Sequence, residues 1–106
     1  MARLDPVEGS EQAGIRPCIV VSRNAINLHS PVIMITPITD AENLSRAYPS
    51  NVLIRAPEGG LRFDSVALTA QTRAISRTRL LRRLGSLQPA TLSGINEALR
   101  ITLDLR

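Results

Sequence analysis

Short apolar runs rich in β-branched residues alternate with turn-forming residues along most of the chain. Gly, Pro, Asn or Ser bounds each run, and this pattern is typical of β-strands. We expect strands at residues 18–22, 32–38, 51–55 and 65–70, with a weaker one at residues 80–87. We also expect a short helical piece at residues 40–47 and a turn at residues 76–80.

Only near the C-terminus does the apolar pattern take a helical period. Aliphatic side chains there recur at spacings of three and four, so one face of a helix is apolar. These side chains belong to Leu92, Ile95, Ala98, Leu99 and Leu103. Pro89 suits the first turn of that helix. Several strands followed by one terminal helix predict an α+β, mostly β fold: a small curved sheet or open barrel with the helix packed on it.

Composition is that of one globular domain spanning residues 1–106. All 13 basic residues are arginine, and against 9 acidic residues they give a net charge of +4. This balance leaves an RNA or DNA partner open without establishing one. Cys18 is the sole cysteine, which excludes an intramolecular disulfide, and it lies in an apolar run as a small hydrophobe would. No leader and no apolar run of about 20 residues is present, so we expect a cytoplasmic protein without a membrane span.

Two glycines bracket a polar loop that ends at an arginine. Gly9 and Gly14 give this loop conformational freedom, and Arg16 follows where the loop meets a strand. A guanidinium held at the root of a strand suits phosphate, because its planar fork of donors matches phosphate oxygens. The loop therefore predicts a phosphate site.

Three blocks of the sequence match a known family in order and spacing. They are residues 9–17 with the strand after them, residues 32–39, and residues 60–66 followed by 71–76 and 79–80. With the closing amphipathic helix, they cover residues 4–105. On these blocks the chain resembles the MazF/PemK family of toxin endoribonucleases from type II toxin–antitoxin systems.

The resemblance implies an SH3-like barrel, a homodimer, and metal-independent cleavage of single-stranded RNA at a short sequence, with no cofactor. It also implies a cognate antitoxin, similar to MazE, with an acidic C-terminal segment. By the same resemblance, Arg16 and Thr39 form the catalytic pair, and Glu11 of the glycine loop contributes to activity.

The chemistry of RNA assigns roles to these residues. RNA supplies its own nucleophile, the 2′-OH, so cleavage needs a proton acceptor, charge stabilisation at phosphorus and a proton for the leaving 5′ oxygen. Arg16 suits charge stabilisation, since an arginine stays protonated at neutral pH and is a poor base. Thr39 can donate a hydrogen bond to a phosphate oxygen, and Glu11 is the available base. The products would be a 2′,3′-cyclic phosphate and a 5′-hydroxyl.

Several other residues are candidates for RNA contacts, although solvated loop polarity explains them about as well. They are Ser10, Gln12, Gly14, Gln71 and Arg73. Asp64 and Ser65 are better explained as stabilising a turn before their strand. His29 matches no family motif, and we expect it in a surface loop.

A cluster of arginines near the C-terminal helix has three open interpretations: RNA steering, a solvated face, or an antitoxin-binding surface. It comprises Arg77, Arg79, Arg82 and Arg83. Tyr48 and Phe63 are the only aromatic residues, so base stacking can contribute little.

The family's usual first strand is absent from this sequence. We expect either that the start site is set too far downstream or that the protein folds with a truncated first strand and an incomplete barrel. Two alternatives to RNA cleavage stay open on the same fold. One is a non-enzymatic inhibitor of DNA gyrase similar to CcdB, and the other is an RNA-binding regulator. The RNA recognition sequence, the cellular target and the identity of the antitoxin do not follow from these residues.

Overall fold

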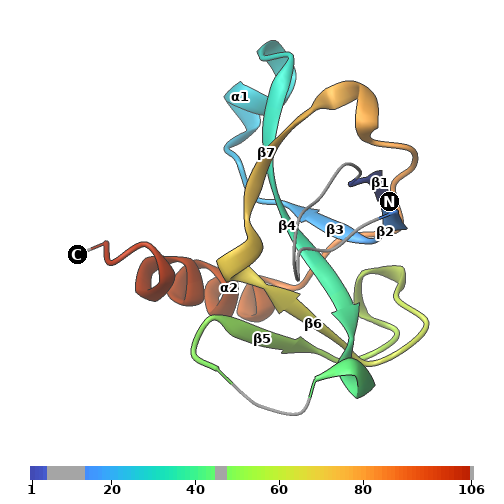
Figure 1. Ribbon diagram of the computed structural model, residues 1–106, viewed down its shortest axis with the longest axis vertical. Coiled ribbons are helices and arrows are strands. Elements are labelled where there is room, and N and C mark those ends of the chain that lie inside the picture. The colour runs from blue at the N-terminus through green and yellow to red at the C-terminus, as the bar shows by residue number, and fades with distance from the viewer. Residues whose placement is uncertain (5–13, 45–47, 106) are drawn as a thin grey trace.

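The longest strand, β4 (Val32–Asp40), runs through the middle of the protein and organises the sheet around it (Figure 1). The structure, a computed structural model, describes residues 1–4, 14–44 and 48–105. β4 forms antiparallel pairs with β3 (Cys18–Val20), β6 (Ser65–Leu68) and β7 (Arg73–Ser76). β5 (Asn51–Ile54) pairs with β6 and lies at the end of the sheet.

β4 is long enough to hold two successive neighbours along one edge. Residues 32–35 of β4 lie opposite β7, and residues 38–40 lie opposite β6. The 3₁₀ turn η3 (Thr69–Gln71) connects β6 to β7, while β3 lies along the other edge of β4. This switch of partner bends the sheet strongly. The mostly β fold with a C-terminal helix is therefore confirmed.

A second, two-stranded ladder pairs β1 (Ala2–Arg3) with β2 (Ile15–Arg16). The first strand is thus short, as expected, but it is not absent. β1 also bridges to Leu80 on its other side. Burial explains why so short a strand is stable: Ala2 and Leu4 are both fully buried, whereas Arg3 between them is exposed. The alternation of β1 thus matches one apolar and one solvated face.

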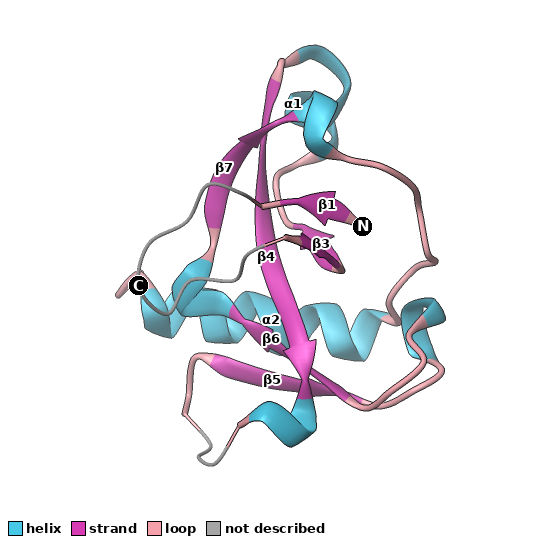
Figure 2. Cartoon of the chain, turned by 45° about the vertical axis from the view of Figure 1, so that its right-hand side comes forward, coloured by secondary structure: helices cyan, strands magenta, loops and turns pink. Residues whose placement is uncertain are grey.

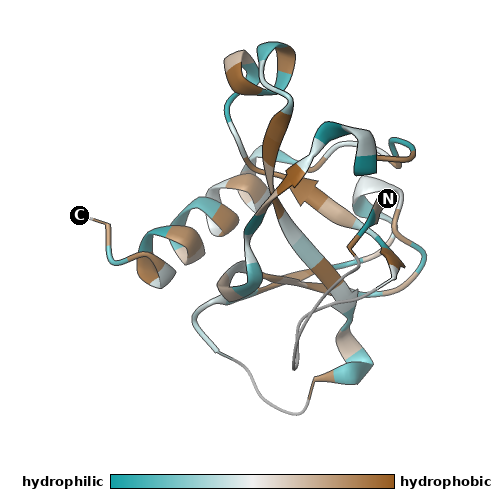
Figure 3. Cartoon of the chain, turned by 45° about the horizontal axis from the view of Figure 1, so that its top comes forward, coloured by the Kyte–Doolittle hydropathy of each residue, from teal (hydrophilic) through white to brown (hydrophobic). Residues whose placement is uncertain are grey.

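The apolar core comprises two clusters, one against the C-terminal helix and one under β1. The first contains Ile19, Ile38, Ile54, Leu61, Ala67 and Ile95. The second contains Ala2, Leu4, Ile33, Ile35 and Ile75. β4 supplies residues to both, and Figure 3 shows apolar stretches along β4 and along the helix.

Helix α2 (Pro89–Thr102) packs beside β5 and η3, and in Figure 2 it runs across the view, crossed by the lower part of β4. Pro89 occupies its first turn, as predicted. A carboxylate oxygen of Glu58 accepts a 3.0 Å hydrogen bond from the backbone N–H of Gln88, which immediately precedes the helix. A carboxylate in this position stabilises the helix, since it pairs with an end amide and faces the positive end of the helix dipole.

The apolar face of α2 is narrower than the sequence pattern predicts. Ile95 and Ala98 are buried, and Leu99 packs against the first core cluster. Leu92 is 42% exposed, and Leu103, which lies just beyond the helix, is 59% exposed. The sheet under α2 therefore covers only its middle turns.

The prediction of a strand at residues 80–87 is wrong. Among the described residues, this segment forms a single bridge, between Leu80 and Ala2, and otherwise follows an irregular course. Close backbone packing sets that course: Gly60 has a φ of +76°, and a Cβ at this position would lie 2.3 Å from the carbonyl oxygen of Leu84. Leu84 and Leu87 lie against Gly60 and Gly59 and pack on the first core cluster rather than extend a sheet.

The sequence pattern did not predict β7 or α1, and it predicted two short turns with different success. The strand β7 has one buried residue, Ile75, and its other three side chains are half-buried or exposed, so it lacks an apolar pattern. Helix α1 (Asn24–His29) has no buried residue, and His29 is therefore the exposed end of a helix, not part of a loop as predicted. The helical piece expected at residues 40–47 is represented by the shorter turn η1 (Ala41–Asn43). The turn expected at residues 76–80 is confirmed as η4 (Arg77–Arg79).

Candidate active site

Arg16 and Thr39 lie on neighbouring strands in one continuous register. β3 and β4 pair antiparallel. Beyond the start of β3, the amide of Ile38 donates a 3.0 Å hydrogen bond to the carbonyl oxygen of Pro17, which extends the ladder toward β2. One residue further in this register, Arg16 lies opposite Thr39, and β2 contacts β4 accordingly. The structure thus brings the two predicted catalytic residues together.

Thr39 is fixed in a buried position at the end of β4. Its backbone pairs with Val66 of β6, and the residue is 6% exposed. The side-chain amide of Asn43 donates a 3.2 Å hydrogen bond to the Thr39 hydroxyl oxygen. This bond uses a lone pair of the oxygen, so the Thr39 O–H can still donate to a phosphate oxygen.

Asn43 was not predicted from the sequence as part of the site. It lies in η1, four residues after Thr39. η1 itself is capped by the Asp40 carboxylate, which accepts a 3.0 Å hydrogen bond from the amide of Glu42. The signal that would have found Asn43 is this Asp-x-x-Asn spacing, because an aspartate cap starts a tight turn that folds the asparagine back toward the strand.

Arg16 combines a fixed backbone with an exposed side chain. Its backbone lies between Ala2 of β1 and Thr39 of β4. Pro17 follows it and restricts the chain at this point. The side chain is exposed, so its guanidinium is accessible to a polyanion. A cation at this position can stabilise charge that develops at a phosphate.

Much of the glycine loop lies outside the described residues. Ser10, Glu11 and Gln12 belong to that part, so the structure does not test their predicted roles. Gly14 is described: it has a φ of +73°, and its carbonyl accepts a 2.8 Å hydrogen bond from the amide of Leu4. A Cβ at this position would meet nothing within 4 Å, so the positive φ, and not lack of space, favours glycine here.

Gln71 and Arg73 flank the end of η3, both half-buried. A guanidinium nitrogen of Arg73, Nη1, donates a 3.1 Å hydrogen bond to the carbonyl oxygen of Leu4. Arg73, predicted as an RNA contact, therefore contacts the protein's own β1 end. Its binding to RNA and that of Gln71 stay predictions.

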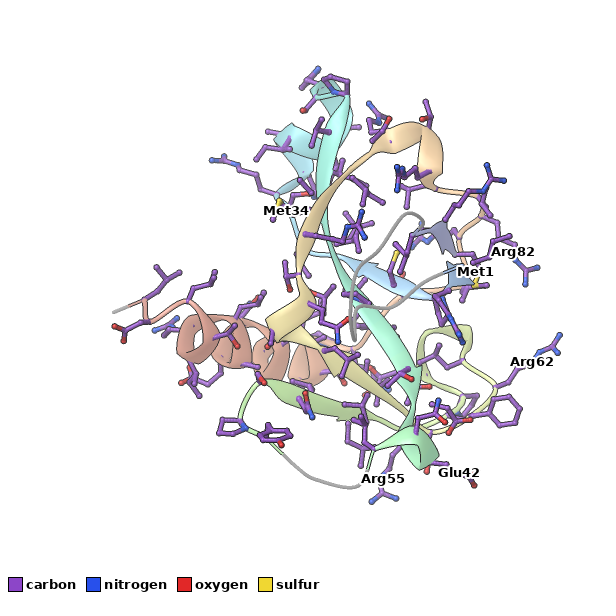
Figure 4. The ribbon with its side chains drawn as sticks, in the orientation of Figure 1. Met1, Met34, Glu42, Arg55, Arg62 and Arg82 are labelled. Atoms are coloured by element: carbon purple, nitrogen blue, oxygen red, sulfur yellow. The ribbon has the colours of Figure 1, made fainter. Side chains whose placement is uncertain are left out.

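A groove of 750 Å³ lies along β3, and neither Arg16 nor Thr39 lines it. Pro17 and Ile38, the next residue on each strand, line it, and because successive side chains of a strand alternate between faces, the groove lies on the opposite face from the pair. The opposite wall is the irregular segment at residues 80–87. The amino group of Met1 donates a 3.0 Å hydrogen bond to the carbonyl of Arg82 there, and Figure 4 shows the two residues together.

Three of the four clustered arginines line this groove. Arg77, Arg82 and Arg83 line it, whereas Arg79 is not among its lining residues. Arg82 and Arg83 are exposed, and Arg77 donates to the carbonyl of Leu28 at 3.4 Å. Three guanidinium groups thus give the groove a positive rim, which suits either of the anionic partners expected from the sequence.

Cys18, Asp64 and Ser65 lie in environments that give them structural roles. Burial raises the pKa of the Cys18 thiol, with the amino-terminal charge opposing part of that shift, so the protonated, unreactive form is favoured. The Asp64 carboxylate accepts a 2.9 Å hydrogen bond from the amide of Ala56, and the Ser65 hydroxyl donates to the carbonyl of Phe63 at 2.8 Å. The structural role predicted for Asp64 and Ser65 is therefore confirmed.

Neither a metal cluster nor a membrane-spanning helix occurs in the described part of the chain. Within residues 1–4, 14–44 and 48–105, no three or more His, Cys, Asp or Glu side chains have the arrangement needed to hold a metal ion. Within the same residues, no helix has the length and apolar character needed to cross a bilayer.

Comparison with known proteins agrees with the fold. A family model described as PemK-like, MazF-like toxin of type II toxin–antitoxin system matches residues 1–103. Endoribonuclease MazF9 of Mycobacterium tuberculosis is 40% identical over 107 residues, which cover 96% of this chain and 89% of that protein.

Two solved structures have the same architecture. The Mycobacterium tuberculosis toxin MazF-mt6 superposes with a TM-score of 0.81 at 26% identity, covering 99% of this chain and 94% of that chain. An endoribonuclease in complex with its cognate antitoxin, from a mycobacterial species, superposes with a TM-score of 0.76 at 26% identity. That match covers 88% of this chain and 84% of the other.

The curved sheet with its terminal helix, together with this identity to an endoribonuclease over nearly the whole chain, defines the class: a small toxin endoribonuclease. The chain belongs to the family of PemK-like, MazF-like toxins of type II toxin–antitoxin systems.

Proposed function

We propose that this toxin, a single domain over residues 1–106, cleaves single-stranded RNA, without a metal ion, by attack of the 2′-OH on the adjacent phosphorus. The observation that carries the proposal is the register that places Arg16 opposite Thr39. In this reaction the new bond joins the 2′ oxygen to phosphorus, and the bond from phosphorus to the 5′ oxygen breaks. The products are a 2′,3′-cyclic phosphate and a 5′-hydroxyl.

Arg16 stabilises the negative charge that develops on the phosphoryl oxygens. Its backbone is held between β1 and β4 while its side chain is exposed, so the guanidinium is anchored at its base and accessible to RNA. Donors arranged in advance at the charge of a transition state are often the largest single contribution to catalysis. Arg16 stays protonated at neutral pH, so another group takes the 2′ proton.

Thr39 supplies a second donor from the opposite strand. Asn43 donates to its oxygen, which leaves the O–H of Thr39 available to donate to a phosphate oxygen. Glu11 is the proposed acceptor of the 2′ proton, on chemical grounds alone. Its carboxylate is the basic group that the glycine loop offers, five residues before Arg16 in the sequence.

The partners follow from the family and the surface. The substrate is messenger RNA, whose cleavage stops translation and growth, and the regulator is a cognate antitoxin with an acidic segment. The three-arginine rim of the groove beside Pro17 and Ile38 complements either anion. We propose that the toxin acts as a homodimer in the cytoplasm.

A cleavage assay in EDTA tests the proposal. The wild type and an Arg16→Ala variant are incubated with a long single-stranded RNA, and Arg100→Ala serves as control because Arg100 is exposed on α2 and pairs only loosely, at 3.8 Å, with Glu97. We expect cleavage by the wild type and the control, and a loss of about 10²- to 10³-fold in Arg16→Ala. Activity abolished by EDTA, or full activity in Arg16→Ala, contradicts the proposal. Products with 5′-phosphate ends would exclude attack by the 2′-OH.

A further inference from the structure

Both backbone groups of Leu4 are used in holding the end of β1. Its amide donates a 2.8 Å hydrogen bond to the carbonyl of Gly14, in the register of the β1–β2 ladder. Its carbonyl accepts the 3.1 Å hydrogen bond from Nη1 of Arg73. The side chain of Leu4 is fully buried. Leu4 is thus the point where β1 is tied both to β2 and to the main sheet.

Arg73 belongs to the main sheet. It lies on β7 directly opposite Ile35 of β4, the strand that carries Thr39 four residues later. Its guanidinium reaches from there to the end of β1. A charged donor to a carbonyl is a strong hydrogen bond, and a half-buried one is less screened by water than an exposed one.

At its Leu4 end, β1 is held to the main sheet by burial of the Leu4 side chain beside Ile35 and Ile75 and by the polar bond from Arg73. At its start, β1 is held by the bridge between Ala2 and Leu80 and by the bond from the Leu81 amide to the Met1 carbonyl. Those contacts lie on the side of residues 80–82. At the Leu4 end, the Arg73 side chain provides a polar tie to the sheet that carries Thr39.

We infer that Arg73 is a positioning residue that sets Arg16 relative to Thr39 by clamping β1. Arg16 pairs with Ala2 of β1, so a shift of β1 moves the backbone of Arg16 against β4. This inference rests on the proposed roles of Arg16 and Thr39. It replaces the expectation of an RNA contact at Arg73 with an internal one.

Three variants separate a clamp from an RNA contact. Arg73→Met keeps the apolar stem of the side chain but removes every donor, Arg73→Lys restores one donor, and Arg100→Met removes the same charge from an exposed position on α2. For the clamp we expect Arg73→Met to lower kcat by about 10- to 100-fold with KM nearly unchanged, because misplacement of a catalytic group acts on the chemical step. Arg73→Lys recovers part of kcat, and Arg100→Met behaves as the wild type.

The salt dependence of RNA binding gives the opposing outcome. If the Arg73 guanidinium bound an RNA phosphate, Arg73→Met would reduce the slope of log K against log salt by about 0.7 and raise KM. An Arg73→Met enzyme with unchanged kcat, raised KM and this smaller slope overturns the inference.

Hydrogen exchange tests the clamp without RNA. We expect the amide of Leu4 to exchange faster in Arg73→Met than in the wild type or Arg100→Met, and Arg73→Lys to restore protection. Equal exchange rates in all four proteins overturn the clamp, whatever their activity. A wild type that cleaves no RNA removes the proposed function instead, so the two failures are distinct.

Discussion

The amide of Ile38 donates a 3.0 Å hydrogen bond to the carbonyl of Pro17, and this contact sets the register of the candidate site. Proline cannot donate from its own nitrogen, but its carbonyl still accepts, so the ladder passes through this position. The next residue on each strand is Arg16 and Thr39 respectively. A cation and a hydroxyl far apart in the sequence therefore face one another through ordinary antiparallel pairing.

We expect the Thr39 hydroxyl to act mainly on the chemistry, with a smaller contribution to stability through its bond to Asn43. Thr39→Ser keeps the O–H and should retain most of kcat, whereas Thr39→Val has a similar shape and should lose about 10-fold or more. Thr39→Val also leaves the amide of Asn43 without its acceptor, at a cost of about 1 kcal/mol in the free energy of unfolding. Single-turnover cleavage and urea unfolding of both variants measure these effects. Equal rates for serine and valine would remove Thr39 from the reaction.

Two glycines with similar backbone angles should respond differently to alanine. A Cβ at Gly60 would lie 2.3 Å from the Leu84 carbonyl oxygen, whereas at Gly14, whose φ is +73°, it would meet nothing within 4 Å. Gly14→Ala should therefore cost only the left-handed backbone penalty of about 1 kcal/mol. Gly60→Ala adds a clash with backbone and should cost more, about 3 kcal/mol or above. Urea unfolding of the two variants compares them, and equal losses would show that the segment at residues 80–87 yields easily.

The carboxylate of Glu58 should stabilise α2 from outside the helix. Glu58→Gln keeps an acceptor but removes the charge, and Glu58→Ala removes both, so we expect losses of about 0.5 and about 1–2 kcal/mol in the free energy of unfolding. Glu97→Gln, an exposed position within α2, is the matched control and should change stability by under about 0.5 kcal/mol. Thermal unfolding of the three variants decides the matter. A Glu58→Ala protein as stable as the control would mean that the bond to Gln88 contributes nothing.

Strong periodicity made part of the fold predictable. β4 is a long run of β-branched residues, and α2 has Pro89 at its start and Ile95 and Ala98 on its inner face. β7 was missed because Ile75 is its one buried residue, so the sheet partner rather than the local pattern decides its conformation. The prediction of a strand at residues 80–87 was wrong because Leu84 and Leu87 pack against Gly60 and Gly59 and on the first core cluster.

Part of the candidate site was likewise predictable from the sequence, and part was not. Arg16 and Thr39 were predicted from family blocks in the sequence. The hydrogen bond at Pro17 shows how two strands that are far apart in the sequence pair and bring the two residues together. Asn43 and the Arg73 bond to Leu4 depend on how a turn and a side chain fold back across strands, which no local pattern encodes.

The most direct measurement is a double-mutant cycle on single-turnover RNA cleavage, with Arg16→Met, Thr39→Val and the double variant. Two donors that act on the same phosphate depend on one another, so their effects on the barrier do not add. We expect the double variant to be slowed by less than the product of the two single effects, with a coupling energy of about 1 kcal/mol or more. Strictly multiplicative losses, or an Arg16→Met enzyme as fast as the wild type, would contradict a shared site built from Arg16 and Thr39.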